Sequence, residues 1–256
     1  MAGDVVSGPL GCAQCQRLHG AIIRGDTARK HISLVFTGDE YADGGEHILA
    51  VLQRQQVPGS FFLTGRFYRN PRFAPLIGKL VAAGHYLGAH SDRHLLYCDW
   101  QQRDSLLVSR DAFTDDLERN YRAMRAFGIA GADAPYFLPP YEWYNDTISA
   151  WTAAMELQLV NYTPGTLSHA DYTLPDESGY RSSETIYHSI TAYERRQAHG
   201  LNGFILLSHV GTAPERTDKF YLRLEDLIVD LKALGYRFRR IDALLTETSE
   251  ALGNEQ

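Results

Sequence analysis

Short apolar runs alternate with helix-like segments along most of this 256-residue chain, and this alternation is the feature that most restricts its fold. Residues 32–37 and 203–208 are typical runs, because both are brief and apolar, as buried strands are. Longer segments with apolar residues at helical spacing separate such runs. A strand–helix alternation without linker-like composition favours a single α/β domain with a parallel, barrel-like sheet.

The expected elements can be placed by residue number. Strands are predicted over residues 32–37, 60–64, 86–90, 136–138, 157–162, 203–208 and 236–241. Helices are predicted over residues 46–56, 71–83, 109–127, 146–155, 184–199 and 222–234, with a short helix after the last strand. Asn70 and Pro71 are expected to open the second helix as its N-cap and first residue. Residues 1–30 are expected to form a leader before a domain over residues 31–256, and residues 163–181 a long polar loop.

The composition is that of an ordinary globular protein, and it argues against two classes of function. Charged residues make up 22% of the chain, the net charge is −6, and no basic run is present, which argues against a nucleic-acid-binding surface. No apolar stretch approaches the roughly 20 residues of a membrane-spanning helix. The 15 tyrosines suit sugar stacking or a large core, and we expect mainly a core.

The N-terminal region and the cysteines say little about function. The first thirty residues lack the charged start, apolar centre and cleavage site of a signal peptide, so the protein is cytosolic or its signal has been removed. Cys12 and Cys15 form half of a zinc or redox motif, but no second such pair follows. We expect an incidental pair or a disulfide rather than a functional site.

The stretch from His90 to His94 carries the most chemical information. It follows an apolar run and places two imidazoles four residues apart, a spacing that on a helical turn brings both rings to one face and toward one ion. Ser91 is expected to cap that turn. Histidines at this spacing also occur on solvated helix faces, so the pair indicates a metal site only together with other candidate site residues.

Polar residues that follow the predicted strands, His90 among them, form a larger set of candidate site residues. The set comprises Asp39, Glu40, His90, Tyr141, Asp171 and His209. In a parallel α/β barrel, the carboxyl ends of the strands form one rim, and functional sites are built there. The sequence therefore predicts that these side chains meet at one rim.

These residues resemble the motifs of the polysaccharide deacetylase family, the metal-dependent carbohydrate esterases of family 4, over residues 32–244 and in the family's order. The first family motif, Thr-Phe-Asp-Asp, corresponds to Thr37-Gly38-Asp39-Glu40, and the second, His-Ser/Thr-x-x-His, corresponds to residues 90–94. The third, Arg-Pro-Pro-Tyr-Gly, corresponds to residues 138–142. The fourth, Asp-Trp, corresponds loosely to Asp171-Tyr172, and the fifth, Leu-x-His, corresponds to residues 207–209. The resemblance implies a distorted (β/α) barrel of about seven parallel strands. It also implies a hydrolase that removes N- or O-linked acetyl groups from a carbohydrate or polysaccharide.

Three positions depart from the family pattern. Glu40 stands where the family has an aspartate that binds the metal. Leu138 replaces the arginine that orients the family's catalytic base, and Glu142 replaces a glycine and adds a carboxylate near the rim. These departures indicate a divergent branch, in which the metal ligands are retained and the residues around the base are rebuilt or lost.

The resemblance implies that Glu40, His90 and His94 bind a divalent metal. Three protein ligands leave room for water and substrate, as a catalytic site requires. Zn is the expected ion, and Co, Ni or Fe suit the same ligands. The metal would polarise the acetyl carbonyl and lower the pKa of its bound water. The alternative is that both histidines are ordinary surface or core residues.

The same resemblance assigns the remaining roles. Asp39 is expected to act as general base, although it could instead be a loop cap. His209 is expected to be the general acid, kept charged by Asp171. The Tyr141 backbone N–H is expected to stabilise the oxyanion. Trp143, Tyr144 and Tyr172 are expected to stack on sugar or to pack in the core, and Asp43 and Glu142 are spare acids near the rim.

Two other functional hypotheses remain open. The runner-up is a non-catalytic carbohydrate-binding protein that kept the fold, a reading motivated by Leu138 and Glu40. A weaker one is a metallo-hydrolase that cleaves another bond; a zinc protease is disfavoured because His90 is followed by serine and not by the glutamate of His-Glu-x-x-His. Family members act on envelope or extracellular polysaccharides, so the resemblance implies export. The sequence does not predict an oligomeric state.

Overall fold

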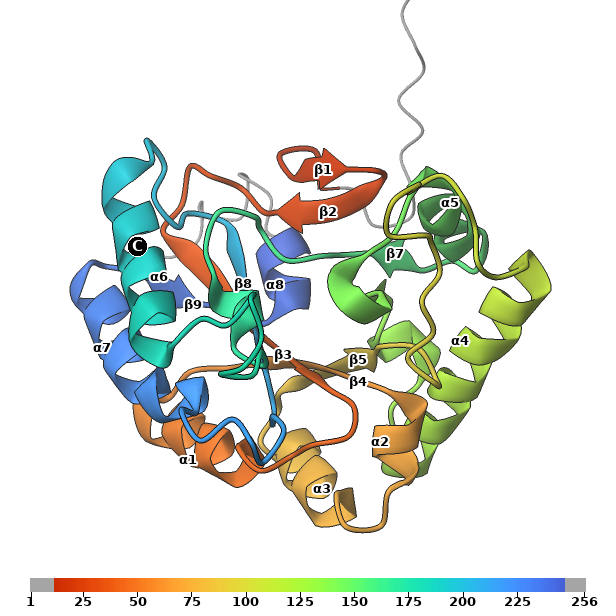
Figure 1. The fold of residues 1–256 in the computed structure, drawn as a ribbon, viewed down its shortest axis with the longest axis horizontal. Coiled ribbons are helices and arrows are strands. Elements are labelled where there is room, and N and C mark those ends of the chain that lie inside the picture. Colours follow the sequence, from red (N-terminus) through yellow and green to blue (C-terminus); the bar gives the residue numbers. More distant parts are fainter. Residues whose placement is uncertain (1–11, 247–256) are drawn as a thin grey trace, which may run out of the picture.

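The computed structural model describes residues 12–246, which form a curled sheet surrounded by helices (Figure 1). The strands are β1 (Gln16–Leu18), β2 (Ala21–Arg24), β3 (His31–Gly38), β4 (Ser60–Leu63), β5 (Tyr86–Ala89), β6 (Tyr136–Phe137), β7 (Gln158–Leu159), β8 (Phe204–His209) and β9 (Arg237–Phe238). Their order in the sheet is β1-β2-β8-β3-β4-β5-β6-β7, and β9 pairs with β3. The strands from β3 to β9 pair in parallel, whereas β1 and β2 are antiparallel.

The two ends of the sheet approach each other. β2 pairs with β8, and Ile22 in β2 also bridges Val160, one residue beyond β7. The backbone N–H of Asn161 donates to the Ile22 carbonyl at 2.9 Å, and the Thr163 hydroxyl donates to the carbonyl of Ile23. These bonds curl the sheet toward closure, and the predicted distorted α/β barrel is confirmed.

The helices follow one another around the outside of the sheet (Figure 1). They are α1 (Gly45–Gln55), α2 (Gly65–Arg69), α3 (Ala74–Ala82), α4 (Arg110–Met124), α5 (Asp146–Ala154), α6 (Ser183–Arg196), α7 (Leu224–Ala233) and α8 (Ile241–Thr246). Side-chain N-caps start several of them: Ser109 accepts from the Ala112 N–H at α4, and Asn145 from the Ile148 N–H at α5. Within the described range, none of these helices is long and apolar enough to cross a bilayer.

The helix predicted over residues 71–83 is wrong at its start. The carboxamide of Asn70 accepts a hydrogen bond from the Arg72 backbone N–H at 3.0 Å, which stabilises a turn and not a helix cap. Helix α3 begins only at Ala74, with Pro75 in its first turn. The preceding residues form the short helix α2, which Thr64 caps by accepting a hydrogen bond from the Phe67 N–H at 3.1 Å.

The part of the chain predicted as a leader carries structure that we did not predict. β1 and β2 lie within residues 1–30, and β2 pairs with β8 in the central sheet. Cys12 and Cys15 form a disulfide just before β1, so the disulfide reading of this pair holds. Where the domain begins stays a prediction, because residues 1–11 lie outside the described range.

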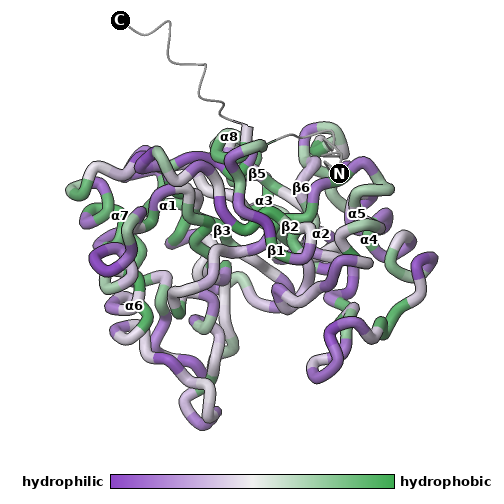
Figure 2. The backbone as a smooth tube through the Cα atoms, turned by 90° about the horizontal axis from the view of Figure 1, so that it is seen from above, coloured by the Kyte–Doolittle hydropathy of each residue, from purple (hydrophilic) through white to green (hydrophobic). Residues whose placement is uncertain are grey.

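The core lies between the sheet and the helices. The aromatic rings of Phe36 and Phe61, on neighbouring strands, stack with their centroids 5.0 Å apart, and both residues are buried. Hydrophobic colour follows the central strands in Figure 2, while hydrophilic colour gathers in the outer loops. Burial of a large apolar side chain stabilises a fold by roughly 1.5–3 kcal/mol, so this core holds the strand ends in fixed register.

Candidate active site

The carboxyl ends of the central strands lie level with one another. Gly38 pairs with Leu63, Leu63 pairs with Ala89, and Ala89 pairs with Phe137. On the other side of β3, Thr37 pairs with His209. The residue after each of these strand ends therefore lies on one rim of the barrel, which is the arrangement expected from the sequence.

A pocket of about 530 Å³ opens at this rim. Its lining includes the predicted site residues Asp39, Glu40, His90, His94, Tyr141, Tyr172 and His209, together with Glu142 and Trp100. The structure thus brings the polar residues from distant parts of the chain to one cavity. Asp171 lies behind this surface, where it contacts His209.

The loop that carries the two histidines is not a helical turn, and this prediction is wrong. Ser91 and His94 both have left-handed backbone conformations, with φ of 69° and 56°. The imidazole rings of His90 and His94 nevertheless lie side by side, with centroids 5.0 Å apart and an angle of 61° between their planes. Convergence of the two rings therefore depends on the loop and not on helical spacing.

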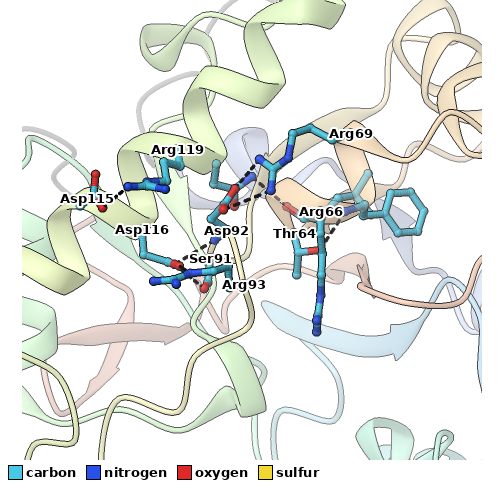
Figure 3. A network of polar contacts seen from close by, with 12 residues as sticks. Thr64, Arg66, Arg69, Ser91, Asp92, Arg93, Asp115, Asp116 and Arg119 are labelled. Atoms are coloured by element: carbon cyan, nitrogen blue, oxygen red, sulfur yellow. Dashed lines mark hydrogen bonds and ion pairs between the residues drawn. The ribbon is translucent and has the colours of Figure 1, made fainter.

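A network of polar contacts holds this loop (Figure 3). The Ser91 hydroxyl donates to the carboxylate of Asp116 in α4 at 2.5 Å and accepts from the Leu95 N–H at 3.3 Å. The backbone N–H of Asp92 donates to the same carboxylate, and Arg69 of α2 pairs with the Asp92 side chain. Buried, charge-assisted contacts of this kind compensate for the strained backbone.

His90 is oriented from behind. The Leu138 carbonyl lies 2.8 Å from Nδ1 of His90, so this nitrogen carries the proton and Nε2 is left as an acceptor. Burial and the neighbouring His94 ring lower the pKa of His90 to about 3. Burial also lowers the pKa of His94 to about 4. Both imidazoles are neutral at pH 7, which is the form that binds metal ions.

Glu40 does not join the two histidines. Its side chain is 60% exposed and pairs with Arg66, whose Nη1 lies 3.7 Å from Oε1. Over residues 12–246, no group of three or more His, Cys, Asp or Glu residues is arranged to hold a metal ion. As the side chains lie, Glu40 does not complete a ligand set with His90 and His94, and the role of these three residues as metal ligands stays a prediction.

Asp39 is held by two residues that the sequence did not single out. The hydroxyl of Thr64 donates to Oδ1 of Asp39 at 2.8 Å, and the Arg66 guanidinium donates to both carboxylate oxygens. Burial alone would raise the pKa of Asp39, but the hydrogen bonds from Arg66 and Thr64 and the Arg66 charge lower it. Asp39 is therefore ionised and fixed in orientation at neutral pH.

Arg66 supplies this contact from a different strand end than the family arginine would. Leu138, at the position of that arginine, is completely buried, and only its carbonyl faces the site. Arg66 lies in α2, which starts directly after β4, and β4 is the neighbour of β3. The sequence shows only that Arg66 lies two residues after a predicted strand. The order of the strands is needed to show that Arg66 lies next to Asp39.

His209, which lines the same pocket, forms a pair with Asp171. Nδ1 of His209 lies 2.6 Å from Oδ1 of Asp171, and the His209 backbone N–H donates to Oδ2 at 3.0 Å. Burial by itself lowers the pKa of His209, but the Asp171 charge and hydrogen bond outweigh it, and the pKa is raised. This pairing engages Nδ1 and not Nε2, and it favours the protonated ring.

Replacing Asp171 with asparagine is expected to move the alkaline limit of activity to lower pH. The carboxylate raises the pKa of His209 against the effect of burial, so its removal lets burial lower that pKa. If His209 donates a proton, the active form is then lost earlier as the pH rises. The pH dependence of kcat/KM measures this, and an unchanged alkaline limb would show that His209 does not titrate in the reaction.

The aromatic residues near the rim fall into two groups. Tyr144 is buried and donates its hydroxyl to the Leu18 carbonyl, so it belongs to the core. Tyr141 and Tyr172 are 45% and 51% exposed in the pocket, where they pack against His94 and His209 respectively. Trp100, which the sequence analysis did not single out, lies beside Tyr141 with ring centroids 5.6 Å apart.

The remaining residues named from the sequence have structural partners. Trp143 donates from its indole N–H to the Asp99 carbonyl and is covered by the Arg103 guanidinium. Asp43 accepts hydrogen bonds from the Thr212 N–H and the Tyr221 hydroxyl and pairs with Lys219. Asp43 therefore fixes the loop after β8 to the loop after β3.

Comparison with known proteins identifies the family. A family model for polysaccharide deacetylases matches residues 24–160. The peptidoglycan-N-acetylmuramic acid deacetylase PdaA of Bacillus subtilis (strain 168) is 27% identical over 232 residues, which cover 90% of this chain and 76% of that protein. The structure of Bacillus subtilis PdaA, a family 4 carbohydrate esterase, matches with a TM-score of 0.68 and 26% identity over 89% of this chain and 85% of that chain.

Two further structures share the fold. A family 4 pseudoenzyme from Bacillus anthracis matches with a TM-score of 0.67 and 21% identity, over 90% of this chain and 70% of that chain. A family 4 acetyl xylan esterase from Clostridium thermocellum, in complex with a cobalt ion, has a TM-score of 0.63 and 20% identity, over 84% and 90% of the two chains. Because the family model covers more than half of the chain and the strand-end motifs meet in one pocket, this protein belongs to the polysaccharide deacetylase family of carbohydrate-active hydrolases.

Proposed function

We propose that this protein hydrolyses acetyl groups from an acetylated carbohydrate or polysaccharide. The main support for the proposal is that two oriented groups, Asp39 and His209, line the same pocket. Asp39 is ionised and held by Arg66, and His209 is held by Asp171 in the form that can give up a proton. A fixed base and a fixed acid are what the hydrolysis of an amide or ester requires.

In the proposed reaction, Asp39 accepts a proton from water as the water oxygen attacks the acetyl carbonyl carbon. The carbonyl electron pair moves to oxygen, and the Tyr141 backbone N–H stabilises the resulting oxyanion. Collapse of the tetrahedral intermediate breaks the bond between the carbonyl carbon and the sugar nitrogen or oxygen. His209 gives its Nε2 proton to that leaving atom, and acetic acid departs and ionises to acetate. Asp39 then releases its proton to solvent and His209 takes one up, which restores the starting state.

The substrate class follows from the pocket and from the family. Trp100, Tyr141 and Tyr172 expose aromatic surface around the two oriented groups, and aromatic rings of this kind pack against sugar rings. The related Bacillus subtilis protein is a peptidoglycan-N-acetylmuramic acid deacetylase. We therefore propose an N- or O-acetylated glycan as substrate, and an envelope or extracellular location for the reaction.

The competing hypothesis is a carbohydrate-binding protein without activity. Leu138 in place of an arginine favours it, and one structural relative is a pseudoenzyme. Arg66 argues against a binding protein without activity, because its guanidinium makes the bidentate contact to Asp39 that Leu138 cannot make. Acetate release and glycan binding, measured in parallel over N-acetylated and O-acetylated oligosaccharides, separate the two: turnover supports the enzyme, whereas binding without turnover supports the binding protein.

Metal dependence is tested separately. The neutral imidazoles of His90 and His94 are suitable donors, and when bound an ion would act as a Lewis acid. After equilibration with zinc and desalting, we expect about one ion per wild-type chain and much less for His94→Ala. No ion in either protein would contradict the metal prediction, and Glu40→Ala would show whether Glu40 contributes.

A further inference from the structure

Glu142 lies in the active-site pocket with a backbone conformation that disfavours it. Its φ is 52°, and the φ of the preceding Tyr141 is 59°. A side chain at such φ values costs free energy that glycine does not incur. Two consecutive non-glycine residues with positive φ at the rim of a pocket are a backbone outlier, and outliers of this type often occur at functional sites.

The surrounding structure holds Glu142 in this conformation. The side-chain amide of Asn161 donates to the Glu142 carbonyl at 2.8 Å, and the Glu142 N–H donates to the Pro139 carbonyl at 3.1 Å. Glu142 is one of the residues that line the pocket, as is His209. Its Oε1 atom is shielded from solvent and has no hydrogen-bond partner among the described residues.

The groups that influence the pKa of the Glu142 carboxyl include no lysine or arginine. Burial raises the pKa of Glu142 to about 7, and the Asp171 charge adds to this effect while His209 opposes it. The carboxyl is therefore mostly ionised above pH 7, and this is the range in which it can pair with a cation. Tyr162 and Tyr172 also face it, and the pKa of each is raised, first by burial and then by the Glu142 charge. Since no lysine or arginine contributes to the pKa of Glu142, a cation brought by the substrate would find an unpaired acceptor in the pocket that also contains His209.

We propose that Glu142 binds the leaving nitrogen of an N-acetylated amino sugar and makes this site selective for amides over esters. This inference rests on the proposed deacetylase function. When His209 gives its proton to the sugar nitrogen, that nitrogen becomes positively charged before the bond between carbon and nitrogen breaks. An ester oxygen that receives the same proton becomes a neutral alcohol. A carboxylate beside the leaving atom therefore stabilises amide cleavage and gives an ester no such advantage.

The test compares kcat/KM on two probes, an oligomer of N-acetylglucosamine and an O-acetylated xylo-oligosaccharide. Glu142→Gln is expected to lower the value for the amide by about 10-fold or more, the size of one lost charge-assisted contact, and to leave the value for the ester unchanged. Glu142→Gly is expected to show the same selective loss. An equal amide-to-ester ratio in wild type and both variants would overturn the proposal.

Stability measurements separate this role from a structural one. Glu142→Gly removes the strain at positive φ, so its Tm is expected to rise while its activity on the amide falls. Glu156 is the matched control, because it is an exposed glutamate with a φ of 60° outside the pocket. Glu156→Gly is expected to raise Tm without changing either activity. Loss of both stability and activity in Glu142→Gly would contradict the proposed role.

A binding measurement gives a readout that does not depend on turnover. The deacetylated glucosamine oligomer carries the ammonium groups that Glu142 is proposed to bind, so its affinity is expected to fall in Glu142→Gln relative to wild type. Equal affinity would count against the inference. If wild type releases acetate from neither probe, the proposed function itself fails, whereas an active wild type with an unchanged ratio in the variants overturns only the role of Glu142.

Discussion

Replacing Asp39 with asparagine is expected to lower kcat for acetate release by about 10²- to 10⁴-fold, the usual contribution of a general base. The carboxamide keeps the size of the side chain and can still accept hydrogen bonds from Thr64 and Arg66, so the fold is expected to survive. It cannot take a proton from water at neutral pH. The comparison is made by steady-state kinetics on an N-acetylated oligosaccharide.

A matched carboxylate provides the control for Asp39→Asn. Asp176 lies exposed in the loop beyond Asp171, outside the pocket, and Asp176→Asn removes the same charge. Its kcat is expected to equal that of the wild type. If Asp39→Asn retained wild-type kcat with an intact fold, Asp39 would be an ordinary loop residue, which is the alternative that the sequence left open.

Arg66→Ala is expected to lower kcat by about 10²-fold, the loss associated with a misplaced catalytic group. The guanidinium contacts both oxygens of Asp39, and the Thr64 hydroxyl alone leaves the carboxylate free to rotate. Because Arg66 acts through Asp39, the loss should fall on kcat more than on KM. Arg66→Lys keeps the charge but not the two-pronged geometry, so it is expected to restore only part of the rate.

Arg72→Ala is the control for the arginine, because Arg72 is exposed and lies outside the pocket. Wild-type kcat in Arg66→Ala would mean that this divergent site does not need its base to be held. An equal fall in Arg66→Ala and Arg72→Ala would show a general effect of charge or stability instead of positioning.

Much of the rim could be predicted because it depends on strand ends. Asp39, His90 and His209 each follow an apolar run, and in a parallel sheet such positions meet at one edge. The structure places all three in one pocket. The helical turn predicted for residues 90–94 was wrong, because the loop is shaped by Asp116 and Arg69, two partners that only tertiary structure brings to it.

Strands β1 and β2 were not predicted, and neither was the contact of Arg66. β7 and β9 were predicted over residues 157–162 and 236–241 but have only two residues each, because their extent depends on closure of the sheet and not on a strong local pattern. Arg66 meets Asp39 because β4 lies next to β3 with Gly38 level with Leu63. Strand order and register are set by packing across the whole barrel, so a single sequence does not reveal this contact.

The departures from the family pattern acquire different meanings in the structure. Leu138 does not leave Asp39 without an arginine partner, because Arg66 donates to its carboxylate from the end of the next strand. Glu40 is exposed and pairs with Arg66, and it forms no metal-binding group with the histidine pair among residues 12–246. Glu142 occupies a position where glycine would relieve strain, and it lines the same pocket as His209.

The most direct test of the central claim is a joint measurement of acetate and free amine released from an N-acetylated glycan by wild type and Asp39→Asn. The account predicts that acetate and amine appear in equal amounts with the wild type and that both remain near background with the variant. Binding of the glycan by wild-type protein without release of either product would contradict it. Equal release by the two proteins would contradict it as well.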